Sequence, residues 1–365
     1  MSGDTEVIAR MDTPAEMLAA IPALLGFYPA ESLVVATLKE SEGQLEVGLM
    51  ARTDLPCPSE YQNFATGLLT GPLGRCRLDR AMLFVVTEGT GTCTATSCRS
   101  CTHNTGSQPP ASDQQLPHAE LITILQTLLG AARIATYSMY VPTIAAGQRW
   151  QHYDDPHSTG TVPDPKSSAV AAAMAMQGSV TFGSREEIAA LIAPDIDEVA
   201  RFTERLEVLL NESVEDISEV EGLRIVLGAV DRIAAGQALT DEELLRVQVA
   251  VADTEVRDLA MSTAVGDSAG AAEQLWMLLA RKAPAPEVAE PLALLAVSAF
   301  LRGEGGLVRA ALTRIAEDAP EHMLGWMLQT ATDAGLDPRE VLRPTVREAA
   351  LKAEQLLTGA PPVNP

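Results

Sequence analysis

The sequence has few basic residues, few aromatic residues and few cysteines. Its 365 residues include 26 Lys and Arg against 49 Asp and Glu, a net charge of −23 at pH 7, and only 4% are aromatic. Nucleic acids and anionic lipids bind basic surfaces, so the charge argues against direct nucleic-acid or membrane binding. Five cysteines are an odd number in a chain of this length, so we expect reduced thiols rather than a disulfide framework.

Long hydrophobic runs are also missing. The longest apolar stretches, residues 291–301 and 139–146, are much shorter than the roughly 20 residues that span a bilayer. The first ten residues contain Asp4 and Glu6 and lack the apolar segment of a secretory signal. We therefore expect a cytoplasmic protein without a membrane-spanning helix.

Apolar residues are plentiful, at 47% of the chain, which is far more than a disordered protein carries. The length and the hydrophobic pattern predict an α+β protein with two domains. Residues 1–183 form a mixed α/β domain, with a β-sheet flanked by helices, and residues 184–365 form an all-helical domain. The first part has 10 basic and 17 acidic residues and the second has 16 and 32, so the helical part carries most of the negative charge.

Short apolar, β-branched runs predict the strands of the first domain. A hydroxyl cap followed by proline at Thr13 and Pro14 predicts the first helix. The predicted strands are residues 32–38, 44–52, 80–87, 137–144 and 148–153. The predicted helices are residues 13–22, 58–69, 116–134 and 168–178, and polar loops cover residues 88–111 and 153–165.

From Ser184 onward the pattern is helical, with breaks at proline and glycine. Residues 291–324 resemble one helical hairpin of the tetratricopeptide kind, with Gly303 in the turn, although a stable array needs about three copies. Trp276 and Trp326 are expected to pack inside the helical core. The acidic segment 195–221 is interpreted as a solvated helix face, and the alternative is a docking surface for a basic partner.

The most specific candidate site lies in the long loop after the 80–87 strand. Cys93, Cys98, Cys101 and His103 provide three thiolates and one imidazole, which is a legitimate tetrahedral zinc set. Four ligands within eleven residues would wrap a metal very tightly, and His118 or His152 could replace one of them. The alternative is a surface loop with reduced thiols.

A second candidate loop follows the 148–153 strand. His152, Asp154, Asp155 and His157 place two imidazoles and two carboxylates within six residues. These groups could bind a divalent metal or perform acid/base chemistry. The alternative is a polar turn closed by Pro156, because Asp-Asp-Pro is common in turns.

Common catalytic signatures are absent from the sequence. The Gly89-Thr90-Gly91 segment follows a strand, but it lacks the third glycine of a dinucleotide site and the Lys-Ser/Thr of a phosphate-binding loop. The chain contains neither a Gly-x-Ser-x-Gly elbow nor a His-Glu-x-x-His helix. The motifs therefore leave open whether the protein is an enzyme.

Residues 24–35 read LLGFYPAESLVV. This run resembles the start of an uncharacterised, mostly actinobacterial family called domain of unknown function 4192. Similar later segments are Arg149-Trp150 with Gly160, Val256-Arg257-Asp258 with Leu275-Trp276, and residues 301–305 running into Ala311-Leu312. Relatives often carry a cysteine cluster after the Arg-Trp strand, where this chain has residues 154–157 without cysteine. The resemblance implies kinship but no established activity.

Two functional hypotheses follow from these observations. The first is a non-enzymatic interaction or regulatory scaffold whose helical domain binds a protein partner. The alternative is a metal- or small-ligand-binding protein, or an enzyme, with its site between the loops 88–111 and 153–165. Residues 26–29, with Glu31 and Ser32, could line the same pocket, although such a Gly/Pro-broken entry to a buried strand is more often architectural. The sequence does not predict an oligomeric state.

Overall fold

The computed structural model describes residues 10–41, 44–75, 78–89, 115–176, 178–211, 217–336 and 338–359. The chain divides into two compact units, Met1–Arg185 and Glu186–Pro365. The first, which we call the α/β unit, contains a six-stranded mixed sheet. The second, the helical unit, contains only helices among its described residues. The α+β fold class predicted from the sequence is confirmed.

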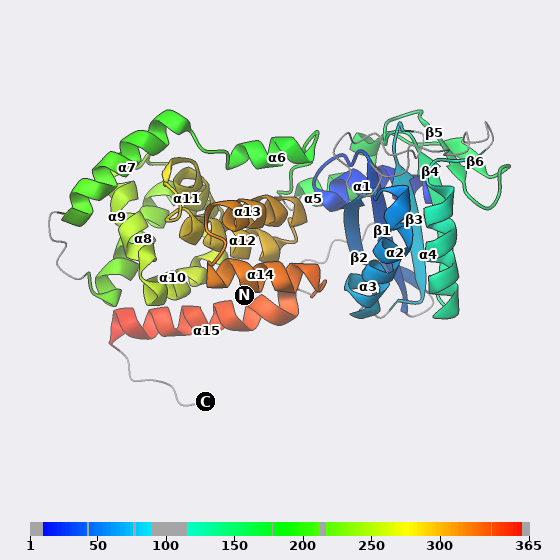
Figure 1. Ribbon diagram of the computed structural model, residues 1–365. Coiled ribbons are helices and arrows are strands. Elements are labelled where there is room, and N and C mark those ends of the chain that lie inside the picture. The colour runs from blue at the N-terminus through cyan, green and yellow to red at the C-terminus, as the bar shows by residue number, and fades with distance from the viewer. Residues whose placement is uncertain are drawn as a thin grey trace. The chain divides into compact units, whose positions relative to one another are not determined.

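The sheet has the strand order β2-β1-β3-β4-β5-β6, which can be followed in Figure 1. Its strands are β1 (Ser32–Ser41), β2 (Gln44–Asp54), β3 (Arg80–Val86), β4 (Ala135–Val141), β5 (Arg149–His152) and β6 (Thr159–Thr161). Strands β3 and β4 pair in parallel, and all other neighbours pair antiparallel. A parallel pair needs a crossover connection, and α4 (Ala119–Ala131) lies within it.

The central strands bury side chains on both faces of the sheet. Leu33 and Val35 of β1 pack with residues of α2 (Tyr61–Thr70), α3 (Pro72–Arg75) and α4. Val34 and Ala36 point to the opposite face, where they pack with α1 (Pro14–Leu25). Helix α5 (Ala169–Met176) lies against α1. Because strand side chains alternate between faces, this continuous apolar run requires helices on both sides.

Some helix and strand boundaries differ from those predicted from the sequence. The predicted helix 116–134 begins only at Ala119, because the backbone of His118 is left-handed, with φ 55°. The short helix α3 and strand β6 were not predicted. β6 lies in the segment expected to be a polar loop, where Gly160 pairs with Trp150 of β5. The indole of Trp150 covers Gly160 so closely that a Cβ there would lie 2.8 Å from its ring.

Gly160→Ala should therefore destabilise the α/β unit. Overpacking of this kind costs about 1–3 kcal/mol, because the indole or the strand must move. Hydrogen–deuterium exchange in β5 and β6 should increase. Gly130→Ala is the matched control, because a Cβ at Gly130 in α4 would meet no atom within 4 Å. Alanine also favours the helix, so hydrogen–deuterium exchange in α4 should match that of the wild type or be slightly slower. Unchanged exchange in the Gly160 variant would contradict this packing.

The helical unit is organised around α12 (Ala289–Arg302), which is buried without interruption from Pro291 to Phe300. A helix that is apolar on all sides belongs at the centre of a bundle. The other helices are α6 (Arg185–Leu191, starting at the unit boundary), α7 (Ile196–Asn211), α8 (Glu219–Ala234), α9 (Asp241–Ala252), α10 (Thr254–Ala260), η3 (Met261–Ala264), α11 (Ala269–Lys282), α13 (Gly305–Asp318), α14 (Met323–Asp333) and α15 (Pro338–Thr358). No helix among the described residues is long and apolar enough to cross a membrane.

Helices α12 and α13 form a hairpin. Gly303 ends α12 with a left-handed backbone, φ 79°, and the Glu304 N–H donates to the Ala299 carbonyl at 2.9 Å. Whether this hairpin is one copy of a repeat stays a prediction. Trp276 is fully buried, as expected, but the expectation for Trp326 was wrong, because its side chain is 62% exposed. The buried face of α14 is formed instead by small and aliphatic residues such as Gly325 and Leu328.

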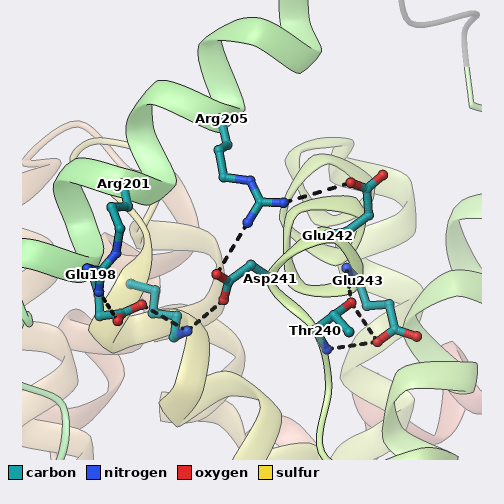
Figure 2. A network of polar contacts seen from close by, with 8 residues as sticks. Glu198, Arg201, Arg205, Thr240, Asp241, Glu242 and Glu243 are labelled. Atoms are coloured by element: carbon teal, nitrogen blue, oxygen red, sulfur yellow. Dashed lines mark hydrogen bonds and ion pairs between the residues drawn. The ribbon is translucent and has the colours of Figure 1, made fainter.

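A network of charges joins α7, α9 and α11 at the surface of the helical unit (Figure 2). The Lys282 ammonium, in the last turn of α11, lies 3.0 Å from Glu198 Oε2 and 2.8 Å from Asp241 Oδ1. Arg205 contacts Asp241 and Glu242, and Glu198 also pairs with Arg201. Both carboxylates that contact Lys282 lie in the first turn of a helix, where the helix dipole also favours negative charge.

Lys282→Met should destabilise the helical unit at neutral pH and make it less sensitive to acid. The hydrogen bond from Lys282 is the main cause that lowers the pKa of both Glu198 and Asp241. Carboxylates with lowered pKa values contribute stability at neutral pH and lose it as the pH falls through those values. Without Lys282, this loss should be smaller.

Urea unfolding at pH 7 and at about pH 4 measures both effects. Arg246→Met is the matched control, because Arg246 makes one exposed contact, at 3.5 Å to Glu242 within α9. The control should unfold much like the wild type, since such exposed pairs contribute little. Equal unfolding of the two variants would show that Lys282 is no more important than an ordinary surface cation.

Candidate functional site

One edge of the sheet brings together three chain segments that are distant in sequence. Ser32, the first residue of β1, pairs with Val86, the last residue of β3, and Val86 pairs with Val141 at the end of β4. The Thr87 N–H continues this ladder by donating to the Val141 carbonyl at 3.2 Å. The residues before β1 and those after β3 therefore meet at the carboxyl ends of the two parallel strands, where α/β proteins commonly bind ligands.

Glu31 enters this edge in a strained conformation, because its φ of 46° is rare for a residue with a side chain. Neighbouring hydrogen bonds hold it there. The Leu55 N–H donates to the Glu31 carbonyl at 3.2 Å. Arg52 donates from Nε to Ser32 Oγ at 2.7 Å and from Nη2 to the Ala30 carbonyl at 3.2 Å. Strain that the surroundings over-determine in this way is typical of functional sites.

The Glu31 carboxylate is fixed by residues that follow β3. The Thr87 hydroxyl donates to Oε2 at 2.6 Å, and the Glu88 N–H donates to Oε1 at 3.2 Å. The Thr87 oxygen in turn accepts from the Gly89 N–H at 2.9 Å. Among the described residues, each carboxylate oxygen thus has one donor, which leaves it a further lone pair. The side chain of Thr87 is buried, whereas Glu31 and Glu88 are exposed.

His118 lies at the start of α4, and its imidazole is oriented by α2. Its Nδ1 lies 2.6 Å from the hydroxyl of Tyr61, which is buried in the first turn of α2. Burial lowers the pKa of His118, and the Glu31 carboxylate partly opposes this shift. The imidazole is therefore neutral at pH 7 and can accept a proton. Its Nε2 has no hydrogen-bond partner within the part of the chain that the structure describes.

Two further tyrosines, Tyr140 and Tyr153, lie near these residues, and Tyr140 belongs to the same cluster. Burial raises the pKa of Tyr140, and the nearby carboxylates of Glu31 and Glu88 raise it further. Burial also raises the pKa of Tyr153, whose hydroxyl donates to the Pro117 carbonyl at 2.5 Å. These phenols stay protonated at neutral pH and can act as hydrogen-bond donors. We call the group formed by Glu31, Tyr61, Thr87, His118 and Tyr140 the edge site.

Of the two candidate sites predicted from sequence, the structure describes only one. Cys93, Cys98, Cys101 and His103 lie outside the described residues, so the zinc hypothesis stays a prediction. The same holds for a joint site between this cysteine loop and the loop at 152–157. Among the described residues, no three His, Cys, Asp or Glu side chains are placed to hold a metal ion.

The loop at 152–157 is a turn with local hydrogen bonds. The Asp154 N–H donates to His152 Nδ1 at 3.0 Å, and the His157 N–H donates to Asp155 Oδ1 at 3.0 Å. The His152 ring packs edge-on against Tyr137, with centroids 4.4 Å apart, while His157 is exposed. These contacts match the turn alternative, and a ligand role for the four residues stays a prediction.

Sequence reasoning offered Glu31 as one candidate pocket residue, with an architectural role as the favoured alternative, and missed the pairing of His118 with Tyr61. These two residues are 57 positions apart, and neither belongs to a motif. One local signal was available, because Pro117 and His118 directly precede an amphipathic helix.

Comparison with known proteins assigns a family. A family model described as "Domain of unknown function (DUF4192)" matches residues 14–339. The chain belongs to this family. No curated protein and no solved structure matches this DUF4192 protein. All five residues of the edge site lie within the matched segment, as do most residues of the helical unit.

The pH titration of His118 tests the electrostatics of the edge site. In an NMR titration, its imidazole should titrate below the ordinary histidine value of about 6.5, because burial disfavours the charged form. Glu31→Gln should lower the midpoint further, because it removes a negative charge that stabilises the imidazolium. A midpoint that does not change in this variant would show that the two side chains are not coupled.

Proposed function

We propose that the α/β unit of this DUF4192 protein binds a small polar molecule at the edge site. The observation that carries this proposal is the strained Glu31, whose carboxylate is held by Thr87 and Glu88 beside the neutral His118. Maintaining a left-handed glutamate costs of order 1–3 kcal/mol, and residues held in such strained conformations cluster at active sites and ligand-binding sites.

The available groups define the ligand chemistry. Among the described residues, the donors to Glu31 leave it lone pairs that accept hydrogen bonds, so an amine, amide or hydroxyl group suits it. His118 Nε2, which has no partner among the described residues, adds a donor or an acceptor according to the tautomer, and Tyr140 adds a donor. A neutral imidazole and a fixed carboxylate also form a usable pair for general acid/base catalysis, so the same site supports either binding or reaction.

A scaffold function of the helical unit is our second candidate. A specific observation favours it: Met323, Trp326 and Met327 are 66%, 62% and 54% exposed on one face of α14. Large side chains that remain exposed together mark interaction surfaces. A protein partner, a cytoplasmic location and an actinobacterial origin belong to this proposal and rest on composition and family resemblance.

Native mass spectrometry of gently purified, reduced protein tests the ligand proposal. We expect a mass excess of one small organic molecule in the wild type and its loss in Glu31→Gln. Glu46→Gln is the matched control. Glu46 is exposed on β2, and it lies opposite Lys39 in the β1–β2 ladder, toward the other end of β1 from Glu31. The control should keep the adduct.

Other outcomes separate the hypotheses. Equal adducts in the wild type and in Glu31→Gln would place the ligand elsewhere, and bare wild-type protein would count against a co-purifying ligand. A mass excess of one zinc ion that is lost in Cys98→Ser would support the metal alternative instead.

A further inference from the structure

The helical unit contains a groove that is separate from the edge site. It has a volume of about 490 Å³ and lies where the start of α8, helix α10, η3 and helix α15 meet. Figure 1 shows α15, in red, running alongside α10. The groove is lined by Glu219, Glu255, Asp258, Leu259, Met261, Thr345, Glu348, Ala349, Lys352 and Leu356.

The floor of the groove is apolar. Leu259, Met261 and Ala349 are buried with 9%, 6% and 7% of their surfaces exposed, and Leu356 packs against the core cluster that contains Leu259. These residues come from α10, η3 and α15, so the floor forms only when the three elements pack together. A concave apolar surface of this size can hold an anchoring side chain of a partner.

The rim of the groove is acidic. Four carboxylates surround the floor, and Lys352 is the only basic residue among the described residues of the lining. Lys352 contacts Glu348 at 2.8 Å, and Arg257 from outside the groove contacts Asp258 at 2.7 Å. Glu219 and Glu255 differ, because neither pairs with a cation among the described residues, and the neighbouring Glu255 carboxyl raises the pKa of Glu219. A cation nearby favours the charged form of a carboxyl group, so a basic side chain suits this pair.

We propose that this groove docks a basic amphipathic peptide segment of a partner protein. An apolar side chain of the segment enters the floor, and an Arg or Lys beside it reaches Glu219 and Glu255. Charge complementarity identifies this partner, because the acidic rim and the strongly acidic helical half attract cations and repel anionic partners. The inference is independent of the ligand proposed for the α/β unit.

Two properties of the groove favour a peptide over a metal ion. The described residues provide no set of three metal ligands, and the apolar floor would remain uncovered by a bare ion. An amphipathic segment covers the floor and neutralises the rim at the same time, which is the usual arrangement of an apolar centre with a polar periphery.

Fluorescence anisotropy with the labelled peptide acetyl-ARLRRLRA-amide and the full chain tests the proposal. We expect saturable binding that weakens as salt rises, and no binding of acetyl-AELEELEA-amide. The double variant Glu219→Gln, Glu255→Gln should weaken binding about fivefold or more, because two exposed charge contacts are lost. Thr345→Trp, at an exposed lining position on α15, should block the groove without removing charge.

The matched control is Glu317→Gln, Glu321→Gln, which removes the same charge from exposed positions outside the groove lining. It should bind the peptide like the wild type. The proposal is overturned by equal weakening in both double variants, by wild-type binding in Thr345→Trp, or by no wild-type binding at 1 mM peptide. Circular dichroism checks that each variant keeps its helices.

Discussion

The α/β unit depends on one constraint, which is that its central strands must be covered on both faces. Leu33, Leu83 and Val85 are fully buried on one side, and Val34, Phe84 and Val86 are fully buried on the other. No single layer of helices can cover such strands, so α1 lies on one face and α2 and α4 on the other. With both faces covered, the ends of the central strands are the natural place for polar side chains.

That edge is where the chain places its strained backbone. Glu31 and His118 both adopt left-handed conformations at points where the chain turns between a layer of the sheet and its neighbouring segment. In each case a hydrogen bond from another element fixes the side chain. Thr87 donates to Glu31, and Tyr61 pairs with His118. The rigid core therefore provides the hydrogen bonds that keep the two side chains oriented.

The helical unit solves a different problem, because it must bury a long apolar helix while carrying most of the negative charge. The apolar residues surround α12, and most carboxylates lie at helix starts or at exposed positions, with Glu273 of α11 as a buried exception. Some are neutralised by a single cation that serves several helices, as Lys282 does between Glu198 and Asp241. Glu219 and Glu255 instead line a groove and pair with no cation among the described residues, which makes them candidates for a docking site.

The sequence by itself determined the class of fold, the position of the first helix and hairpin, and the helical character of the second half. These features depend on local periodicity and on caps such as Thr13 with Glu16, which act within a few residues. It also determined the large acidic excess, which is a property of composition.

Only the tertiary structure decided which polar residues meet. Tyr61 contacts His118 across 57 positions, and Glu31 contacts Thr87 across 56, because the order of strands in the sheet brings their segments together. The expectation for Trp326 failed for the same reason. Helix α14 buries the face that carries Gly325, Leu328 and Ala331, and Trp326 lies outside it. Which face of a helix is covered depends on the elements packed against it rather than on the residue itself.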